Sequence, residues 1–75
     1  HRVRGGDTML KDKRQRLSLT TAEMAEIVGV SEATISYYEN YLRFPNITKL
    51  TTIQMAYKLS DEELLEYIKE CNNRK

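Results

Sequence analysis

Two short helices joined by a very tight turn are the feature that most constrains how this 75-residue chain can fold. Thr20-x-x-Glu23 is a capping box, in which the hydroxyl and the carboxylate each satisfy a backbone donor at the start of a helix. Gly29 ends that helix, because glycine tolerates the left-handed conformation, and Ser31 caps the next helix only two positions later. Helices joined this tightly must cross steeply, so the second one can protrude from the surface.

Three further helices are expected, over residues 8–16, from Asn46 and from Ser60, where Ser60-x-x-Glu63 forms a second capping box. Apolar residues recur in these segments at helical spacing, and no stretch alternates with the period of two that marks a strand. The residues expected on the inner faces of the five helices are Leu10, Leu17, Met24, Ala25, Val28, Ile35, Tyr38, Ile47, Leu50, Ile53, Tyr57, Leu64, Leu65, Ile68 and Cys71. The sequence therefore predicts an all-α, compact five-helix domain.

Length and composition exclude several classes of protein. Seventy-five residues form one domain, and no apolar run approaches the ~18–20 residues that a membrane span needs. Cys71 is the single cysteine, so an intramolecular disulfide framework and a cysteine-rich zinc site are excluded, and a reducing cytoplasm is expected. His1 and Cys71 lack partners for a catalytic triad or a metal site, and no phosphate-binding loop is present. We therefore expect no enzymatic activity, no cofactor, no metal and no small-molecule ligand.

The net charge of +1 conceals an uneven distribution. Residues 1–16 contain six basic and two acidic side chains, whereas residues 17–75 contain six basic and nine acidic ones. A basic end on a mildly acidic body favours approach to phosphates, although a solvated helix face with a tail has the same pattern. Residues 1–8 are expected to be a flexible basic arm or a non-native addition, residues 9–72 the domain and residues 73–75 a C-terminal tail.

The segment from Leu19 to Asn40 resembles the helix-turn-helix of phage lambda-repressor-like and Cro-type transcriptional regulators, of the xenobiotic-response-element type. The resemblance extends over about three quarters of the chain and rests on a combination of residues at fixed spacing, namely Ala25, Gly29, Val30, Ser31, Ile35, Glu39 and Asn40. It implies a cytoplasmic bacterial or phage regulator, a repressor or controller. Such a protein binds a partly palindromic double-stranded DNA operator as a homodimer, with the helix over residues 31–39 in the major groove.

The resemblance assigns base contacts to the exposed side of that helix. Four positions there are expected to reach base edges: Glu32, Ala33, Ser36 and Tyr37. A carboxylate can accept from cytosine N4, alanine can contact a thymine methyl group, and a serine hydroxyl can bond either way. Tyr37 offers a ring and a hydroxyl. Glu32 also has a simpler interpretation, because an acidic residue in the first turn stabilises the helix dipole.

Phosphate contacts are expected at the margins of the same surface. Relatives bind phosphates at the positions of Thr21, where glutamine is common, and of Asn40. Because helix N-termini and basic side chains attract anions, the full set of expected phosphate contacts is Thr21, Ser31, Asn40, Arg43 and Lys49. An N-terminal arm with Arg2 and Arg4 is a candidate for the minor groove.

Other positions concern structure rather than binding. Arg14 and Glu39 match an ion pair of the family that ties the first helix to the end of the third. Tyr41 replaces the glycine that usually follows Glu-Asn, so this tyrosine must avoid or tolerate a positive φ. Gln54 and Lys58 replace the usual alanine and glycine of the fourth helix.

A protein-interaction module on the same fold, similar to an antitoxin or an anti-repressor, is the alternative. The weak basicity of the chain and the presence of Glu32 and Tyr37 on the exposed helix favour it. The two functions differ in salt dependence, because binding to DNA weakens steeply as salt rises. A dimer contact is expected either from apolar side chains of the last helix or from Ile27.

Overall fold

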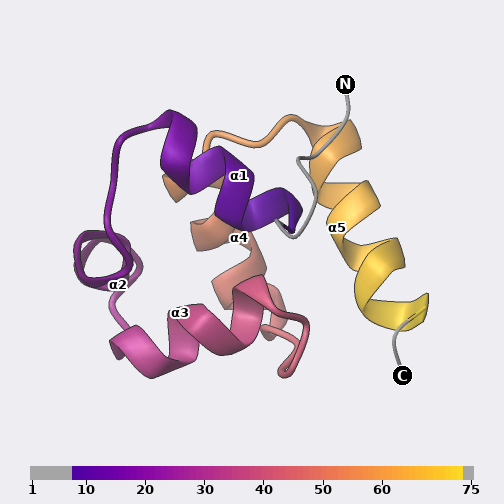
Figure 1. Cartoon of the computed structure of the whole chain (residues 1–75). Helices are drawn as coiled ribbons and strands as arrows, with labels where there is room; N and C mark the ends of the chain where they lie inside the picture. Colours follow the sequence, from indigo (N-terminus) through magenta and orange to yellow (C-terminus); the bar gives the residue numbers. More distant parts are fainter. Residues whose placement is uncertain (1–7, 74–75) are drawn as a thin grey trace.

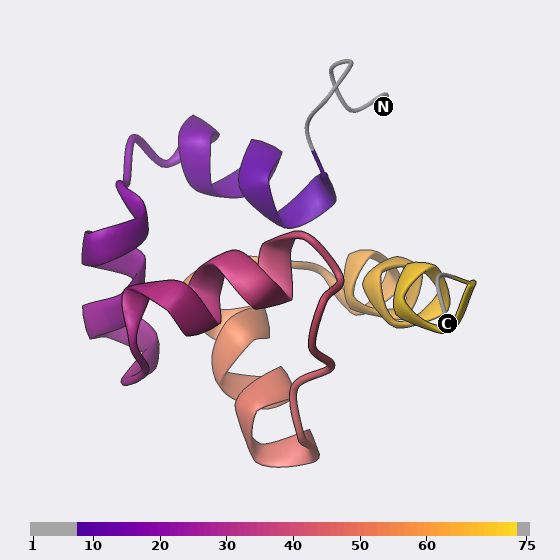
Figure 2. The same ribbon diagram turned by 60° about the horizontal axis from the view of Figure 1, so that its bottom comes forward.

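The computed structural model describes residues 8–73, which form five helices and no strand (Figure 1). The helices are α1 (Met9–Arg16), α2 (Thr21–Val28), α3 (Glu32–Glu39), α4 (Ile47–Ala56) and α5 (Asp61–Asn73). The all-α fold with five helices that the sequence predicts is therefore confirmed. Figure 2 shows α1 along one side of α3, α2 across the N-terminal end of α3, and α5 beside its C-terminal end.

Side-chain caps fix where the helices begin. Both predicted capping boxes are formed: Thr20 and Glu23 exchange hydrogen bonds of 2.8 and 3.1 Å, and Ser60 and Glu63 exchange bonds of 2.9 and 3.1 Å. The caps of the remaining helices each accept one bond from the third helical residue, and they are Thr8, Ser31 and Asn46. Each cap satisfies a backbone donor that has no partner inside its own helix.

The first four helices all end in the same way, with one residue in the left-handed conformation. The next residue then donates its N–H to the carbonyl five positions earlier, which is the Schellman closure. These bonds join Leu19 to Arg14 (3.2 Å), Val30 to Ala25 (3.0 Å), Leu42 to Tyr37 (2.8 Å) and Leu59 to Gln54 (2.9 Å). The left-handed residues are Ser18 (φ 60°), Gly29 (φ 85°), Tyr41 (φ 60°) and Lys58 (φ 57°). Tyr41 thus adopts the positive φ of the glycine that it replaces.

The core lies where the five helices meet. Its buried apolar residues are Leu10, Met24, Ala25, Val28, Ile35, Tyr38, Leu50, Ile53, Tyr57, Leu59, Tyr67 and Cys71. Two expectations for the core are wrong. Ile47 is 81% exposed because it is the first residue of α4 and lies before the buried stripe begins, and Leu65 is 55% exposed.

The residue of α5 that enters the core most deeply is Tyr67, which the apolar periodicity did not single out. Its side chain is fully buried, and its hydroxyl donates to the backbone carbonyl of Tyr38 at 2.9 Å. The ring of Tyr41 stacks on the ring of Tyr67, with 5.7 Å between the centroids. Through these contacts α5 holds the C-terminal end of α3 and the turn that follows it.

Candidate nucleic-acid interface

The turn between α2 and α3 places α3 at the surface. Gly29 has a φ of 85°, and a Cβ added there would meet nothing within 4 Å, so only the backbone angle favours glycine here. Ser31 then caps α3 by accepting from the N–H of Thr34 at 3.1 Å. The inner sides of both helices pack into the core, with Met24 and Ala25 from α2 facing the same interior as Ile35 from α3.

The opposite side of α3 is exposed. Four residues lie on this side, which we call the α3 outer face: Glu32, Ala33, Ser36 and Tyr37. Their spacing of one, three and one positions puts them on one side of a helix with 3.6 residues per turn. Ile35, Tyr38 and Glu39 are buried on the other side. The structure therefore brings together the four side chains that the sequence places at base edges, with no other helix over them.

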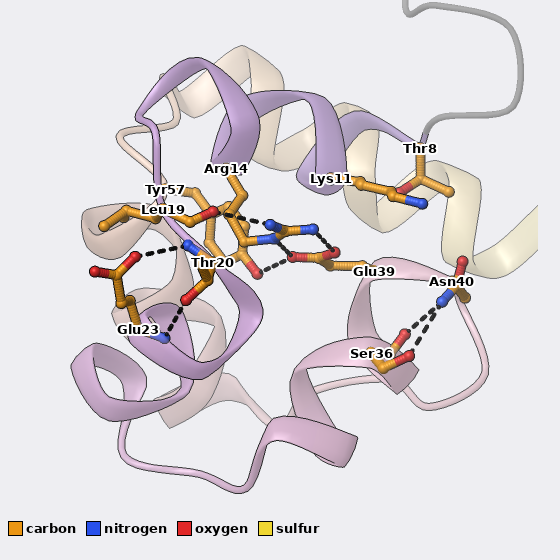
Figure 3. Close-up of polar contacts among 10 residues, drawn as sticks. All are labelled: Thr8, Lys11, Arg14, Leu19, Thr20, Glu23, Ser36, Glu39, Asn40 and Tyr57. Atoms are coloured by element: carbon orange, nitrogen blue, oxygen red, sulfur yellow. Dashed lines mark hydrogen bonds and ion pairs between the residues drawn. The ribbon is translucent and has the colours of Figure 1, made fainter.

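A buried polar network anchors the end of α3 to α1 and α4 (Figure 3). The Nε of Arg14 donates to Glu39 Oε2 at 2.8 Å and its Nη2 donates to Glu39 Oε1 at 3.3 Å. The Nη1 of Arg14 donates to the carbonyl of Leu19 at 2.9 Å. A paired guanidinium and carboxylate with further hydrogen bonds can stay charged in an interior that excludes water. The network consequently fixes the position and the rotation of α3.

Tyr57 is the third member of this network, and the sequence indicated only an apolar role for it. Its hydroxyl donates to Glu39 Oε2 at 2.8 Å. Burial, and then the charge of Glu39, raise the pKa of Tyr57 far above its ordinary value. The hydroxyl therefore remains protonated and keeps its role as a donor to Glu39.

Asn40 and Ser36 form a polar corner at the end of the α3 outer face (Figure 3). Asn40 Nδ2 donates to the carbonyl of Ser36 at 2.9 Å and approaches Ser36 Oγ at 3.4 Å. Because Oγ accepts in that contact, the hydroxyl hydrogen of Ser36 stays available to an outside acceptor. Both side chains are exposed.

The N-termini of α2 and α3 are two candidate sites for phosphates. Thr21 is the first residue of α2 and is half-buried, while Ser31 is the exposed cap of α3. Ser31 Oγ is engaged with both the N–H and the hydroxyl of Thr34. The first N–H groups of each helix point outward and have no partner within their own helix, which makes such ends favourable for anions.

Two basic side chains are the other candidates for phosphate contacts. Arg43 is exposed, and its guanidinium carbon lies 5.2 Å from the centre of the Tyr37 ring. Lys49 is half-buried, and its ammonium donates to the carbonyl of Val28 at 3.5 Å. No acidic residue occurs between positions 40 and 60, so this segment carries positive charge only. Arg2 and Arg4 lie outside the described residues.

A protruding helix that follows a tight glycine turn and is anchored from behind defines a helix-turn-helix DNA-binding domain, with α2 and α3 as the two helices of the motif. The sequence pattern of the helix-turn-helix family matches residues 10–64, and the chain belongs to this lambda-repressor/Cro-like family. No curated protein and no solved structure matches the chain.

Two observations concern other kinds of site. Over residues 8–73, none of the helices has the length and the apolar character that crossing a bilayer requires. In the same part of the chain, His, Cys, Asp and Glu side chains form no group of three or more that could hold a metal ion. Cys71, the single cysteine, is buried and is not part of a disulfide.

Proposed function

We propose that this protein is a small transcriptional regulator, a repressor or controller of bacterial or phage genes, that binds duplex DNA with sequence specificity in the cytoplasm. The observation that carries the proposal is the two-sided character of α3. Its inner side is tied to the core through Glu39, whereas the α3 outer face is free. A helix held from behind can enter the major groove, which is about 12 Å wide, without rearranging the domain.

The α3 outer face offers base edges one carboxylate, one methyl group, one hydroxyl and one aromatic ring. We assign Glu32 to a cytosine amino group, Ala33 to a thymine methyl group, and Ser36 to either a donor or an acceptor. Tyr37 contributes its ring to apolar contacts with a methyl group or a sugar. With these four side chains the surface is suited to discriminate among sequences rather than to bind all duplexes equally.

Phosphates on either side of the groove supply most of the affinity. We assign them to the N-termini of α2 and α3, at Thr21 and Ser31, and to the side chains of Asn40 and Lys49. The unbonded N–H groups of the helix ends and the positive charge of Lys49 both favour anions. We assign Arg2 and Arg4 to contacts in the adjacent minor groove.

Binding as a homodimer to a partly palindromic operator is also part of the proposal. Two copies would place their α3 helices about 34 Å apart, in successive major grooves. Apolar side chains that a second copy would cover are Ile27 (54% exposed) and Met55 (74%), which line a shallow hollow with Thr52 and Ala56. Sedimentation of the complex with a selected duplex tests this part, since two chains per duplex support it and one chain contradicts it.

A salt titration of the full chain against a labelled random duplex tests DNA binding itself. If six or more phosphates are contacted, affinity should fall roughly 10³-fold or more between 50 and 200 mM salt. Lys49→Ala should reduce the salt slope by about one, whereas Lys69→Ala, a matched lysine on the exposed side of α5, should leave it unchanged. Absence of binding at low salt, or a response that does not vary with salt, would favour a protein partner.

A further inference from the structure

The chain turns back after α3 and carries Arg43 onto the α3 outer face. Tyr41 adopts the left-handed conformation, and the N–H of Leu42 closes on the carbonyl of Tyr37 at 2.8 Å. The loop is therefore joined to the last turn of α3 at the residue that bears the aromatic ring. Arg43 follows immediately, with its guanidinium carbon 5.2 Å from the centre of the Tyr37 ring. This separation is within the range of a cation–π contact.

The cation of Arg43 is not neutralised within the described part of the chain. It forms no ion pair among residues 8–73, and the nearest acidic residue in sequence, Glu39, is occupied by Arg14 and Tyr57. Tyr37 is 40% exposed and Arg43 is also exposed. A guanidinium stacked on a ring keeps the N–H groups of its planar edge free, whereas a carboxylate partner would use them.

From these contacts we infer that Arg43 reads a base, together with Tyr37, rather than holding a phosphate as its position in the loop alone would indicate. The planar fork of an arginine matches the O6 and N7 acceptors of guanine in the major groove. Tyr37 is the positioning residue, because its ring sets where that fork lies before DNA arrives. This inference rests on the proposed function, since it names a specificity determinant of the same DNA-binding surface.

Selection of bound duplexes from a random pool, carried out with the wild type and with variants, tests the inference. Wild type should prefer guanine at one position of the site. Arg43→Ala and Arg43→Lys should both lose that preference, by roughly 5- to 100-fold between guanine and the other bases, and should retain the preferences at other positions. Arg43→Lys is the critical comparison, because it keeps the charge but loses the planar fork.

Variants of Tyr37 test the positioning role. Tyr37→Phe keeps the ring and should keep the guanine preference, whereas Tyr37→Ala should lose it. The double variant Tyr37→Ala with Arg43→Ala should lose no more discrimination at that position than Arg43→Ala does. Thermal unfolding of each variant should match the wild type, because both side chains are exposed.

The outcomes separate this inference from the function on which it rests. If Arg43→Ala weakens binding to every sequence equally and Arg43→Lys behaves as wild type, Arg43 is a phosphate contact and the inference is wrong, while DNA binding stands. If the Arg43 variants lose the preference for guanine but Tyr37→Ala keeps it, the positioning role of Tyr37 is wrong. If the wild type binds no duplex at low salt, the proposed function and this inference fail together.

Discussion

The guanidinium of Arg14 and the carboxylate of Glu39, 25 positions apart in the chain, form a two-bond ion pair that is almost completely buried. The pair joins α1 to the last residue of α3, and Tyr57, which caps the C-terminal end of α4, completes it. Three helices are thus tied to one carboxylate. Since no other helix covers the α3 outer face, this network behind the helix orients the face towards a ligand.

Removing the guanidinium of Arg14 should destabilise the domain severely. Arg14→Met leaves the Glu39 charge buried and should cost about 3–5 kcal/mol, which is comparable to the roughly 3–5 kcal/mol that a single core of this size supplies. Urea unfolding measures the loss. Arg43→Ala is the control and should cost less than about 1 kcal/mol, because Arg43 is exposed. A value for Arg14→Met close to that of the control would contradict the structural role of the pair.

The hydroxyl of Tyr57 should contribute separately. Tyr57→Phe keeps the buried ring and removes only the bond to Glu39, so we expect a loss of about 1–2 kcal/mol. Tyr37→Phe removes a hydroxyl from an exposed tyrosine and should change the free energy of unfolding by less than about 0.5 kcal/mol. Equal effects of the two substitutions would mean that Glu39 finds another donor.

Replacing a left-handed residue by glycine should stabilise the fold. Lys58 is exposed and has a φ of 57°, so Lys58→Gly should raise stability by about 0.5–1 kcal/mol after the loss of chain entropy is included. The reverse change, Gly29→Ala, should cost about 1 kcal/mol although the added methyl group meets no atom. Thermal midpoints that move in the same direction for both variants would disagree with this account of the helix ends.

The contact between Lys13 and Glu63 should make stability depend on pH. The hydrogen bond from Lys13, and then the bond from the N–H of Ser60, lower the pKa of Glu63 below its ordinary value. A lowered carboxyl pKa stabilises the folded state above about pH 5, and this stabilisation is lost as the pH falls through the folded-state value. Because a third of the side chain is exposed, the effect should stay below about 1 kcal/mol.

Glu63→Gln isolates this effect, because glutamine can still accept the capping bond from Ser60. The wild type should unfold at a higher temperature than the variant at pH 7, and the difference should shrink towards pH 3. A difference that is constant over this range would show that the ion pair adds no stability.

The helix starts could be predicted from the sequence because their physical signals are local. Each cap and its partner lie within three positions, as in Thr20 and Glu23. The glycine at position 29 likewise predicts the turn at its own position. The helix ends were harder to predict, because Ser18, Tyr41 and Lys58 adopt an angle that their side chains disfavour. The surrounding packing imposes it, for example through the stacking of Tyr41 on Tyr67.

Predictions that depend on distant contacts were less complete. The exposure of the α3 outer face follows from helical spacing, so it could be predicted from neighbouring residues alone. Apolar periodicity gave Leu65 to the core and missed Tyr67, because only the crossing of α5 over the end of α3 decides which side of α5 faces inward. It also gave Ile47 to the core, although this first residue of α4 lies before the buried stripe begins. The contact of Arg43 with Tyr37 depends on the path of the loop, which no short-range pattern specifies.

Chemical-shift mapping of the backbone amides on addition of a selected duplex tests the central claim most directly. If α3 enters the major groove, the largest shifts should fall in the first turn of α2, on the α3 outer face and in residues 41–49. The outward side of α5, around Glu62 and Glu66, should change least. Large shifts on α5 together with an unperturbed α3 would contradict the claim and place the DNA-binding surface elsewhere on the molecule.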